Sequence, residues 1–189
     1  MKTCGKFIAS FLLTLTATLG ACALALTYGD HQYRLILCET DRRGRMNKYD
    51  WLLLTLNAAG KDGLSPVQLQ KSLFIFSKNM PEEIHETFYH FVPYNYGPFD
   101  QTIYSDAEKL DREGLGRIHF FSNRKWPMYY VTPTGHEKAK RLIEGLAPET
   151  IEYLEKVVAW VRSLSFQSLV RTVYKHFPEF KVNSVFQDH

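Results

Sequence analysis

The side chains best suited to catalysis lie in one short segment near the middle of the chain. Three carboxylates and two imidazoles, groups that can transfer protons or ligate a metal, fall within nine residues: Glu82, Glu83, His85, Glu86 and His90. The two histidines are five residues apart, whereas a helix brings residues three or four apart onto one face. The glutamates suit the start of a helix, where negative charge is favourable and carboxylates stay in water. We therefore expect no catalytic or metal site in this segment.

The sequence motifs of the common enzyme classes are also missing. There is no His-Glu-x-x-His or Cys-x-x-Cys pair for a metal, no glycine-rich phosphate loop and no Gly-x-Ser-x-Gly turn for a nucleophilic serine. The cysteines are odd in number and fit no zinc or thiol-redox spacing: Cys4, Cys22 and Cys38. The sequence thus predicts a protein that is not an enzyme and that uses neither a metal nor another cofactor.

Binding of nucleic acid requires positive charge, and here the charge is poorly placed for it. The net charge is +3, but residues 1–45 hold six basic and three acidic side chains, so the remainder of the chain is neutral. The helix expected over Phe99 to Glu113 has five acidic and two basic residues, and DNA phosphates would repel it. A basic and aromatic turn, Arg124-Lys125-Trp126, suits contact with a nucleic acid, although such residues are also ordinary for a solvated turn.

Aromatic residues are unusually dense around a Gly-Pro pair. Seven rings fall within 17 residues: Phe88, Tyr89, Phe91, Tyr94, Tyr96, Phe99 and Tyr104. Tyrosine is enriched at protein interfaces because it buries apolar area and keeps a hydrogen-bonding tip. Most of these rings are expected in the core, with Tyr94, Tyr96 and Tyr104 exposed. The predicted partner is another protein, and the predicted binding face consists of Tyr94, Tyr96, Gly97, Pro98, Phe99 and Tyr104.

Capping signals and hydrophobic spacing predict the elements that position this face. Ser65 is a good N-cap, Pro66 suits the first helical position, and Gln68 completes a capping box. Pro98 is expected in the first turn of the next helix, which runs to Glu113. The other expected elements are a helix over 49–59, strands over 117–121 and 128–132, a helix over 134–146, and two helices that start after Pro148 and at Ser165.

This order of elements predicts a mainly α-helical fold with a small β-hairpin. The predicted architecture is a winged-helix-like domain plus C-terminal helices, over residues 46–189. Winged helices bind macromolecules far more often than they perform catalysis, so the architecture favours a binding role.

Residues 1–45 form a leader with three alternative interpretations. Lys2 and Lys6 precede an apolar run that ends in Leu19-Gly20-Ala21-Cys22, the pattern of a lipoprotein signal that would export the protein through residues 1–22. Alternatively, Met46 is the true start, because Arg42-Arg43 encoded as AGG-AGG would form a ribosome-binding sequence just upstream. The leader could also be an ordered part of the domain. We favour a start at Met46, which predicts a cytoplasmic protein without contact to a membrane.

Several segments between Met46 and about Phe186 resemble a known family. Leu69 to Phe76 resembles the Leu-Gln-Lys-x-Leu-Tyr opening of the SocA-like antitoxin domain, also called Panacea, and of the related YwgA-like proteins. Tyr94 to Phe99 is similar to the aromatic Gly-Pro helix start of these proteins. Further similar segments are Ile103 to Asp106 with Leu110, Gly114 to Gly116, Tyr130 to Gly135, and Phe166 to Phe180.

The resemblance implies a winged-helix fold and a function. Panacea-type members are antitoxins that neutralise a toxin by direct binding. We therefore predict a non-catalytic protein-binding module, an antitoxin or an adaptor, whose partner is a protein such as a toxin. The alternative is a transcriptional regulator that contacts DNA through Arg124, Lys125 and Trp126 and forms a homodimer through residues 151–161.

Overall fold

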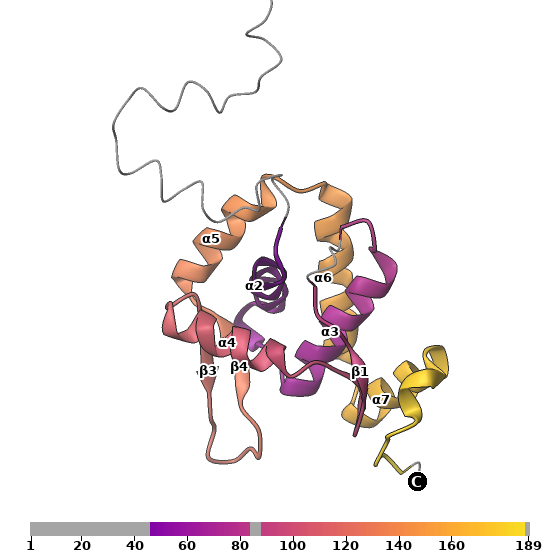
Figure 1. Cartoon of the computed structure of the whole chain (residues 1–189). Coiled ribbons are helices and arrows are strands. Elements are labelled where there is room, and N and C mark those ends of the chain that lie inside the picture. Colours follow the sequence, from indigo (N-terminus) through magenta and orange to yellow (C-terminus); the bar gives the residue numbers. More distant parts are fainter. Residues whose placement is uncertain (1–45, 84–87, 188–189) are drawn as a thin grey trace, which may run out of the picture. The chain divides into compact units, whose positions relative to one another are not determined.

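The structure is a computed structural model that describes residues 46–83 and 88–187. The leader, and with it every interpretation of residues 1–45, lies outside the described residues, as do His85 and Glu86. The described part is mainly helical with two small antiparallel strand pairs (Figure 1). Its elements are α2 (Lys48–Ala59), η1 (Gly60–Asp62), α3 (Pro66–Asn79), β1 (Val92–Tyr94), β2 (Gly97–Phe99), α4 (Thr102–Arg112), β3 (Gly116–His119), β4 (Met128–Val131), α5 (Pro133–Ile143), α6 (Pro148–Ser163), α7 (Phe166–His176) and η2 (Pro178–Lys181).

Helix α2 is the centre of the core. Two thirds of its residues are buried, including the run Trp51 to Leu56, and a helix that is apolar on all sides must be covered on all sides. It packs against α3, α4, α5 and α6, and Figure 1 shows it end-on between them. Helix α6 packs against both α2 and α3. Among the described residues, no helix combines the length and the apolar character that crossing a membrane requires.

Helix α3 starts as the sequence predicts. The Ser65 hydroxyl accepts a hydrogen bond from the Gln68 N–H (3.4 Å), and the Gln68 side chain accepts one from the Ser65 N–H (3.0 Å), which completes the capping box. Pro66 occupies the first turn, where its missing N–H costs nothing. The predicted cap at Ser165 is likewise confirmed, because its hydroxyl accepts the Ser168 N–H at 3.1 Å.

The Gly-Pro pair is not at a helix start, and this prediction was wrong. Gly97 and Pro98 lie in β2, which pairs with β1 across the turn Asn95-Tyr96. Gly97 has a backbone φ of 99°, which residues with a side chain rarely adopt. The chain therefore requires a glycine at the end of this turn. Helix α4 begins only at Thr102, whose N–H donates to the Asp100 carboxylate at 2.8 Å.

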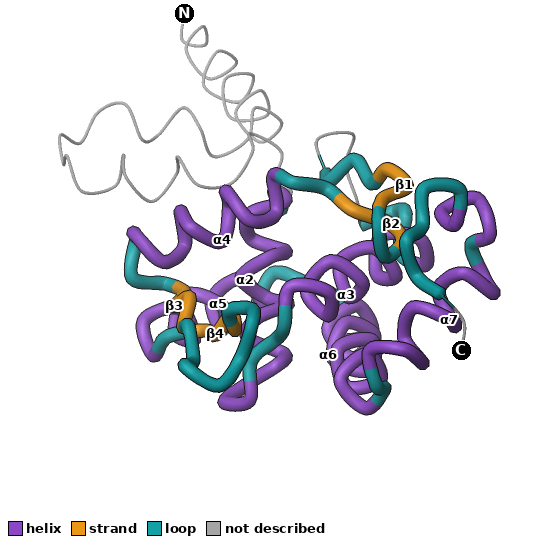
Figure 2. The backbone as a smooth tube through the Cα atoms, turned by 90° about the horizontal axis from the view of Figure 1, so that it is seen from below, coloured by secondary structure: helices purple, strands orange, loops and turns teal. Residues whose placement is uncertain are grey.

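The second hairpin confirms the predicted strands in a shorter form. Strand β3 pairs with β4 from Gly116 opposite Val131 to His119 opposite Met128. Leu64 forms an isolated antiparallel bridge to this hairpin, because its backbone exchanges two hydrogen bonds of 2.9 Å with Tyr129. The two hairpins lie at opposite ends of α4 (Figure 2).

The last three helices complete the domain. Helix α5 ends at Ile143, three residues earlier than predicted. Helix α6 buries Leu154, Val158 and Val161 against the rest of the domain. Trp160, on the opposite side of the same helix, is 40% exposed. The homodimer expected through residues 151–161 stays a prediction.

Candidate functional site

The backbone that follows the β1–β2 hairpin is held by a buried glutamine of α3. Gln70 donates from Nε2 to the Asp100 carbonyl oxygen (2.9 Å) and accepts the Asp100 N–H at Oε1 (3.0 Å). Its side chain is almost completely buried. The side-chain amide of Gln70 thus pairs with both the N–H and the C=O of Asp100, as the backbone of a neighbouring strand would.

The next residue of α3, Lys71, is buried beneath the hairpin. Its side chain is 3% exposed, and its Nζ donates a hydrogen bond of 2.9 Å to the Pro98 carbonyl oxygen. Burial removes water from the ammonium and lowers the pKa of Lys71 from 10.5 to about 7. Sequence reasoning missed Gln70 and Lys71 as site residues and quoted them only as part of a family motif.

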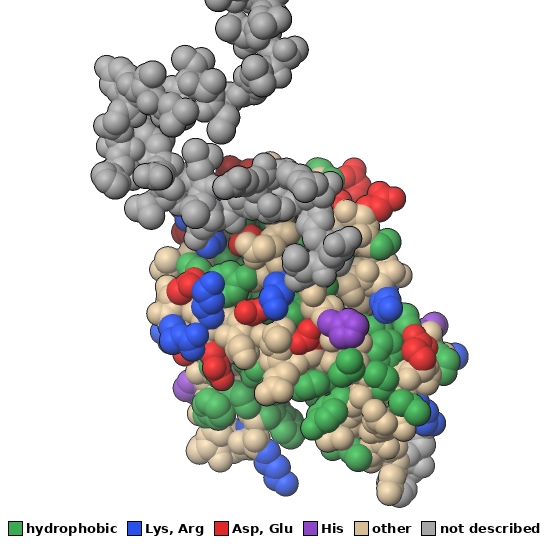
Figure 3. Space-filling view, viewed as in Figure 1, with side chains coloured by type: hydrophobic (Ala, Val, Ile, Leu, Met, Phe, Trp, Pro, Cys, Tyr) green, Lys and Arg blue, Asp and Glu red, His purple; other side chains and the backbone are tan. Residues whose placement is uncertain are grey.

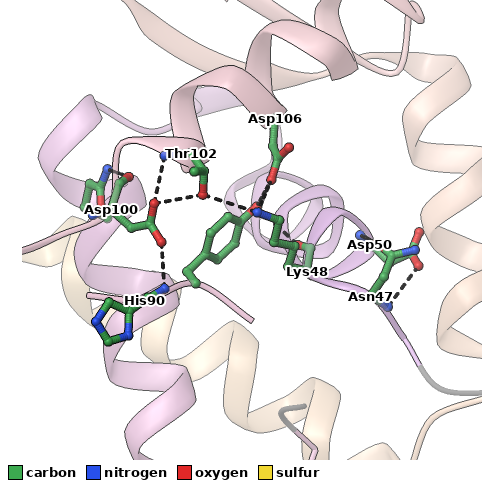
Figure 4. Close-up of polar contacts among 9 residues, drawn as sticks. Asn47, Lys48, Asp50, His90, Asp100, Thr102 and Asp106 are labelled. Atoms are coloured by element: carbon green, nitrogen blue, oxygen red, sulfur yellow. Dashed lines mark hydrogen bonds and ion pairs between the residues drawn. The ribbon is translucent and has the colours of Figure 1, made fainter. Parts of the chain in front are cut away.

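The Asp100 carboxylate fixes both ends of the hairpin. It accepts the His90 N–H before β1 at 2.6 Å and the Thr102 N–H at the start of α4 at 2.8 Å. Figure 4 shows this carboxylate between the two backbone segments. This one short side chain thus joins the entry of β1 to the exit of β2 through two hydrogen bonds.

A second set of polar side chains connects α2 to α4 beside the hairpin. Lys48 forms an ion pair with Asp106 at 3.5 Å (Figure 4). The Tyr89 hydroxyl donates to the same carboxylate at 3.1 Å. Burial, together with the charge of Asp106, raises the pKa of Tyr89. The phenol therefore stays neutral and acts as a hydrogen-bond donor.

The predicted partner-binding residues divide into exposed and buried groups. Tyr94 is 49% exposed and stacks on Phe99 at 4.7 Å, whereas Tyr96 is 40% exposed and lies edge-on to Phe166 at 5.1 Å. These two tyrosines are called the hairpin face below. Phe99 is half-buried, and both residues of the Gly-Pro pair are buried.

Tyr104 does not belong to the exposed group, contrary to expectation. It is half-buried, with its ring stacked on Tyr129 (6.1 Å) and edge-on to Phe99 (5.8 Å). Burial raises the pKa of its phenol. Its position in the first turns of α4 directs it toward the β4 strand, a packing that depends on the tertiary fold.

A cavity of about 150 Å³ lies between the hairpin, α3 and α4. It is called the Lys71 cavity here, and its lining residues are Val67, Gln70, Lys71, Tyr94, Asn95, Tyr96, Gly97, Phe99 and Tyr104. Five of the six residues predicted to bind a partner line it, and Pro98 contributes the carbonyl that Lys71 contacts. The sequence held a signal for Lys71, which is four residues after Val67 and three before the buried Phe74.

The C-terminal segment supports the hairpin from the other side. The Val185 N–H donates to the Asn95 carbonyl oxygen (3.0 Å), and the Asn183 side chain donates to that of Pro93 (3.2 Å). The Tyr174 hydroxyl of α7 donates to Ser184 at 2.7 Å. Figure 1 shows this yellow segment beside β1, a contact that the sequence analysis did not predict.

The other predicted contact, Arg124-Lys125-Trp126, lies in the exposed loop between β3 and β4. Trp126 is 51% exposed, neighbouring Phe120 is 73% exposed, and the Arg124 guanidinium lies 5.5 Å from the Phe121 ring. Figure 3 shows hydrophobic side chains gathered over the lower part of this view, where Figure 1 places both hairpins.

The basic residues of α4 are already paired with acidic ones. Lys109 lies 3.8 Å from Glu113, and Arg112 lies 4.0 Å from Glu108. The Tyr49 hydroxyl also donates to Glu113, at 2.6 Å. The exposed side of α4 therefore presents no surplus of positive charge to a phosphate backbone.

The site offers an ammonium, an amide and aromatic rings, which are groups for recognition. Within residues 46–83 and 88–187, no three His, Cys, Asp or Glu side chains gather in a way that could hold a metal ion.

No protein-family model matches this chain, and no curated protein is significantly similar to it.

Proposed function

We propose that this chain is a non-catalytic winged-helix module that binds another protein, as an antitoxin or an adaptor, through its β1–β2 hairpin. The observation that carries the proposal is that Tyr94 and Tyr96 are well exposed on a hairpin whose backbone is fixed by buried side chains. Fixed aromatic side chains lose little conformational freedom on binding, which favours affinity.

The order of elements supports the winged-helix assignment. Helices α2, α3 and α4 are followed by the β3–β4 hairpin, which takes the place of the wing. The backbone pairing of Leu64 with Tyr129 joins this hairpin to the segment between α2 and α3. All three cysteines lie in the first 45 residues, so the segment from Met46 onward contains none, which is compatible with a reducing cytoplasm.

Capture of the partner by the full-length chain tests this function. The chain carries a C-terminal tag on a flexible linker, and its bound material from native lysate is compared with and without nuclease. We expect one protein in stoichiometric amount that survives nuclease treatment. Recovery of DNA alone, lost with nuclease or salt, would contradict the proposal.

The alternative function is DNA binding through the wing. The observation in its favour is that two basic residues, Arg124 and Lys125, lie beside exposed aromatic rings in the β3–β4 loop. Such a contact would weaken as the salt concentration rises. Under this alternative, Arg124→Ala with Lys125→Ala reduces the mobility shift of DNA, and an unchanged shift at low salt would exclude the wing.

A further inference from the structure

We propose that the Lys71 cavity is a carboxylate-binding pocket, which receives an acidic side chain of the partner protein and pairs it with the Lys71 ammonium. The proposal rests on the protein-binding function above and adds the chemistry of the group that is recognised. It combines the position of Lys71, the size and lining of the cavity, and the space beside Gly97.

The first observation is that Lys71 is buried without a compensating charge among the described residues. An ammonium has three donor hydrogens, and the one hydrogen bond found for Lys71 goes to the Pro98 carbonyl. Burial alone accounts for the lowered pKa, so no nearby carboxylate offsets it. Buried charges in proteins are normally paired, and a carboxylate from outside would supply the missing partner.

A structural role alone does not require this charge. The neighbouring Gln70 holds the same backbone with a neutral amide and makes two hydrogen bonds where Lys71 makes one. A neutral side chain in the place of Lys71 would therefore fix the hairpin without burying an ammonium. The charge itself points to an anionic ligand.

The lining of the cavity fits one carboxylate and its first carbon atoms. A volume of about 150 Å³ is a few times the roughly 30 Å³ that a water molecule occupies in the liquid, which suits an acidic side chain. Aromatic rings of Tyr94, Tyr96 and Phe99 provide apolar walls for the methylene groups.

The titratable groups around Lys71 are phenols rather than acids. Tyr94 and Tyr96 come from the hairpin, Tyr104 from α4, and Tyr174 from α7, whose ring lies against Gly97. No Asp or Glu is among the residues that line the cavity. An incoming carboxylate would therefore meet one positive charge and no negative charge of the lining.

Gly97 keeps the space beside the ammonium open. A Cβ atom at this position would lie 3.5 Å from Lys71 Cε and 3.6 Å from Lys71 Nζ. Any larger side chain here would occupy the approach to the ammonium. The glycine thus serves the turn, through its positive φ, and the pocket, through its missing side chain.

Binding of propionate to the full-length protein tests the pocket directly. Propionate has the carboxylate and methylene groups of a glutamate side chain, and propionamide is its neutral counterpart. We expect propionate to cause a saturable NMR shift of the Gly97 amide and to raise the pKa of Lys71 measured at its ε-carbon. The effect weakens at a pH above the Lys71 pKa, because the amine is then neutral, and propionamide has no effect.

Two variants provide the controls. Lys71→Gln keeps a donor for the Pro98 carbonyl without a charge, and it should abolish the propionate shift. Lys78→Met removes an exposed lysine from the same helix and should leave the shift unchanged. Equal shifts from propionamide, a shift retained in Lys71→Gln, or the lack of saturation would overturn the pocket.

A last comparison separates this proposal from the protein-binding function. If the chain captures its partner but propionate does not bind, the pocket is refuted and the function stands. In a second outcome, propionate binds while Lys71→Gln captures the same amount of partner as the wild type, or while no partner is captured at all. In either case the ligand is a free carboxylate, and the assignment to a partner side chain is refuted. Loss of capture together with loss of propionate binding supports the proposal.

Discussion

Lys71 donates a hydrogen bond of 2.9 Å to the carbonyl oxygen of Pro98, which lies 27 residues later in the chain. The adjacent Gln70 pairs with the backbone of Asp100, 30 residues away. Two consecutive residues of α3 therefore fix strand β2 and the start of α4. The exposed tyrosines of the hairpin face owe their position to these buried contacts.

Removal of the Gln70 amide is expected to destabilise the protein. Gln70→Leu preserves the approximate size of the side chain but leaves the N–H and C=O of Asp100 without partners, at a cost of about 2–4 kcal/mol. Urea denaturation measures the loss in the free energy of unfolding. Gln101→Leu, an exposed substitution next to the same segment, serves as the control and should change stability by no more than about 0.5 kcal/mol.

The buried charge of Lys71 predicts a pH-dependent stability. The folded-state pKa of about 7 lies below the unfolded value of 10.5, so between these values the unfolded chain binds more protons and stability rises with pH. The penalty is complete below pH 7, absent above pH 10.5, and amounts to about 5 kcal/mol.

Lys71→Met isolates this effect from other titrations. At pH 6 the variant should be more stable than the wild type by roughly 3 kcal/mol, because the relieved charge outweighs the lost hydrogen bond. The difference between the two proteins should shrink as the pH rises from 7 toward 10.5. A difference that is independent of pH would show that Lys71 titrates normally in the folded protein.

Gly135 is expected to tolerate no side chain. A Cβ at this position would collide with the backbone oxygen of Leu115, the residue just before β3. Gly135→Ala should cost about 3 kcal/mol through overpacking. Gly114→Ala, at an open position with φ of 70°, should cost only about 1–2 kcal/mol for its backbone strain. Thermal unfolding compares the two, and an equal loss would contradict the close approach at Gly135.

Much of the fold could be predicted because its signals are local. The capping box at Ser65 and the cap at Ser165 depend on residues three apart, and both are found. The β1–β2 hairpin was missed because its strands have three residues each, too few for an alternating pattern to show. The prediction that Pro98 begins a helix was wrong because the fixed φ of proline suits both a helix start and a short strand.

The site could be predicted only in part because burial depends on distant contacts. Tyr94, Tyr96 and Tyr104 look alike in the sequence, yet Tyr104 is stacked on Tyr129, 25 residues later in the chain. The charge of Lys71 favours an exposed position on a helix, but the β1–β2 hairpin covers this side chain. Helical spacing places Lys71 on one face with Val67 and Phe74, but the contacts that cover this face arise from tertiary packing.

The different burial of these tyrosines predicts different effects on stability. Tyr104→Ala removes a ring that packs against Phe99 and Tyr129 and should cost about 3 kcal/mol in the free energy of unfolding. Tyr96→Ala removes a partly exposed ring and should cost about 1 kcal/mol. Urea denaturation of each variant measures these losses, and equal values would contradict the described packing.

The most direct test of the central claim is the affinity of the captured partner for three full-length proteins, measured by titration calorimetry. The wild type and Arg124→Ala with Lys125→Ala should bind with equal affinity, whereas Tyr94→Ala with Tyr96→Ala should bind at least about 100-fold more weakly, as loss of interface anchors does. Circular dichroism confirms that all three are folded. Unchanged binding by the tyrosine variant, or loss of binding by the wing variant, would contradict the hairpin as the binding face.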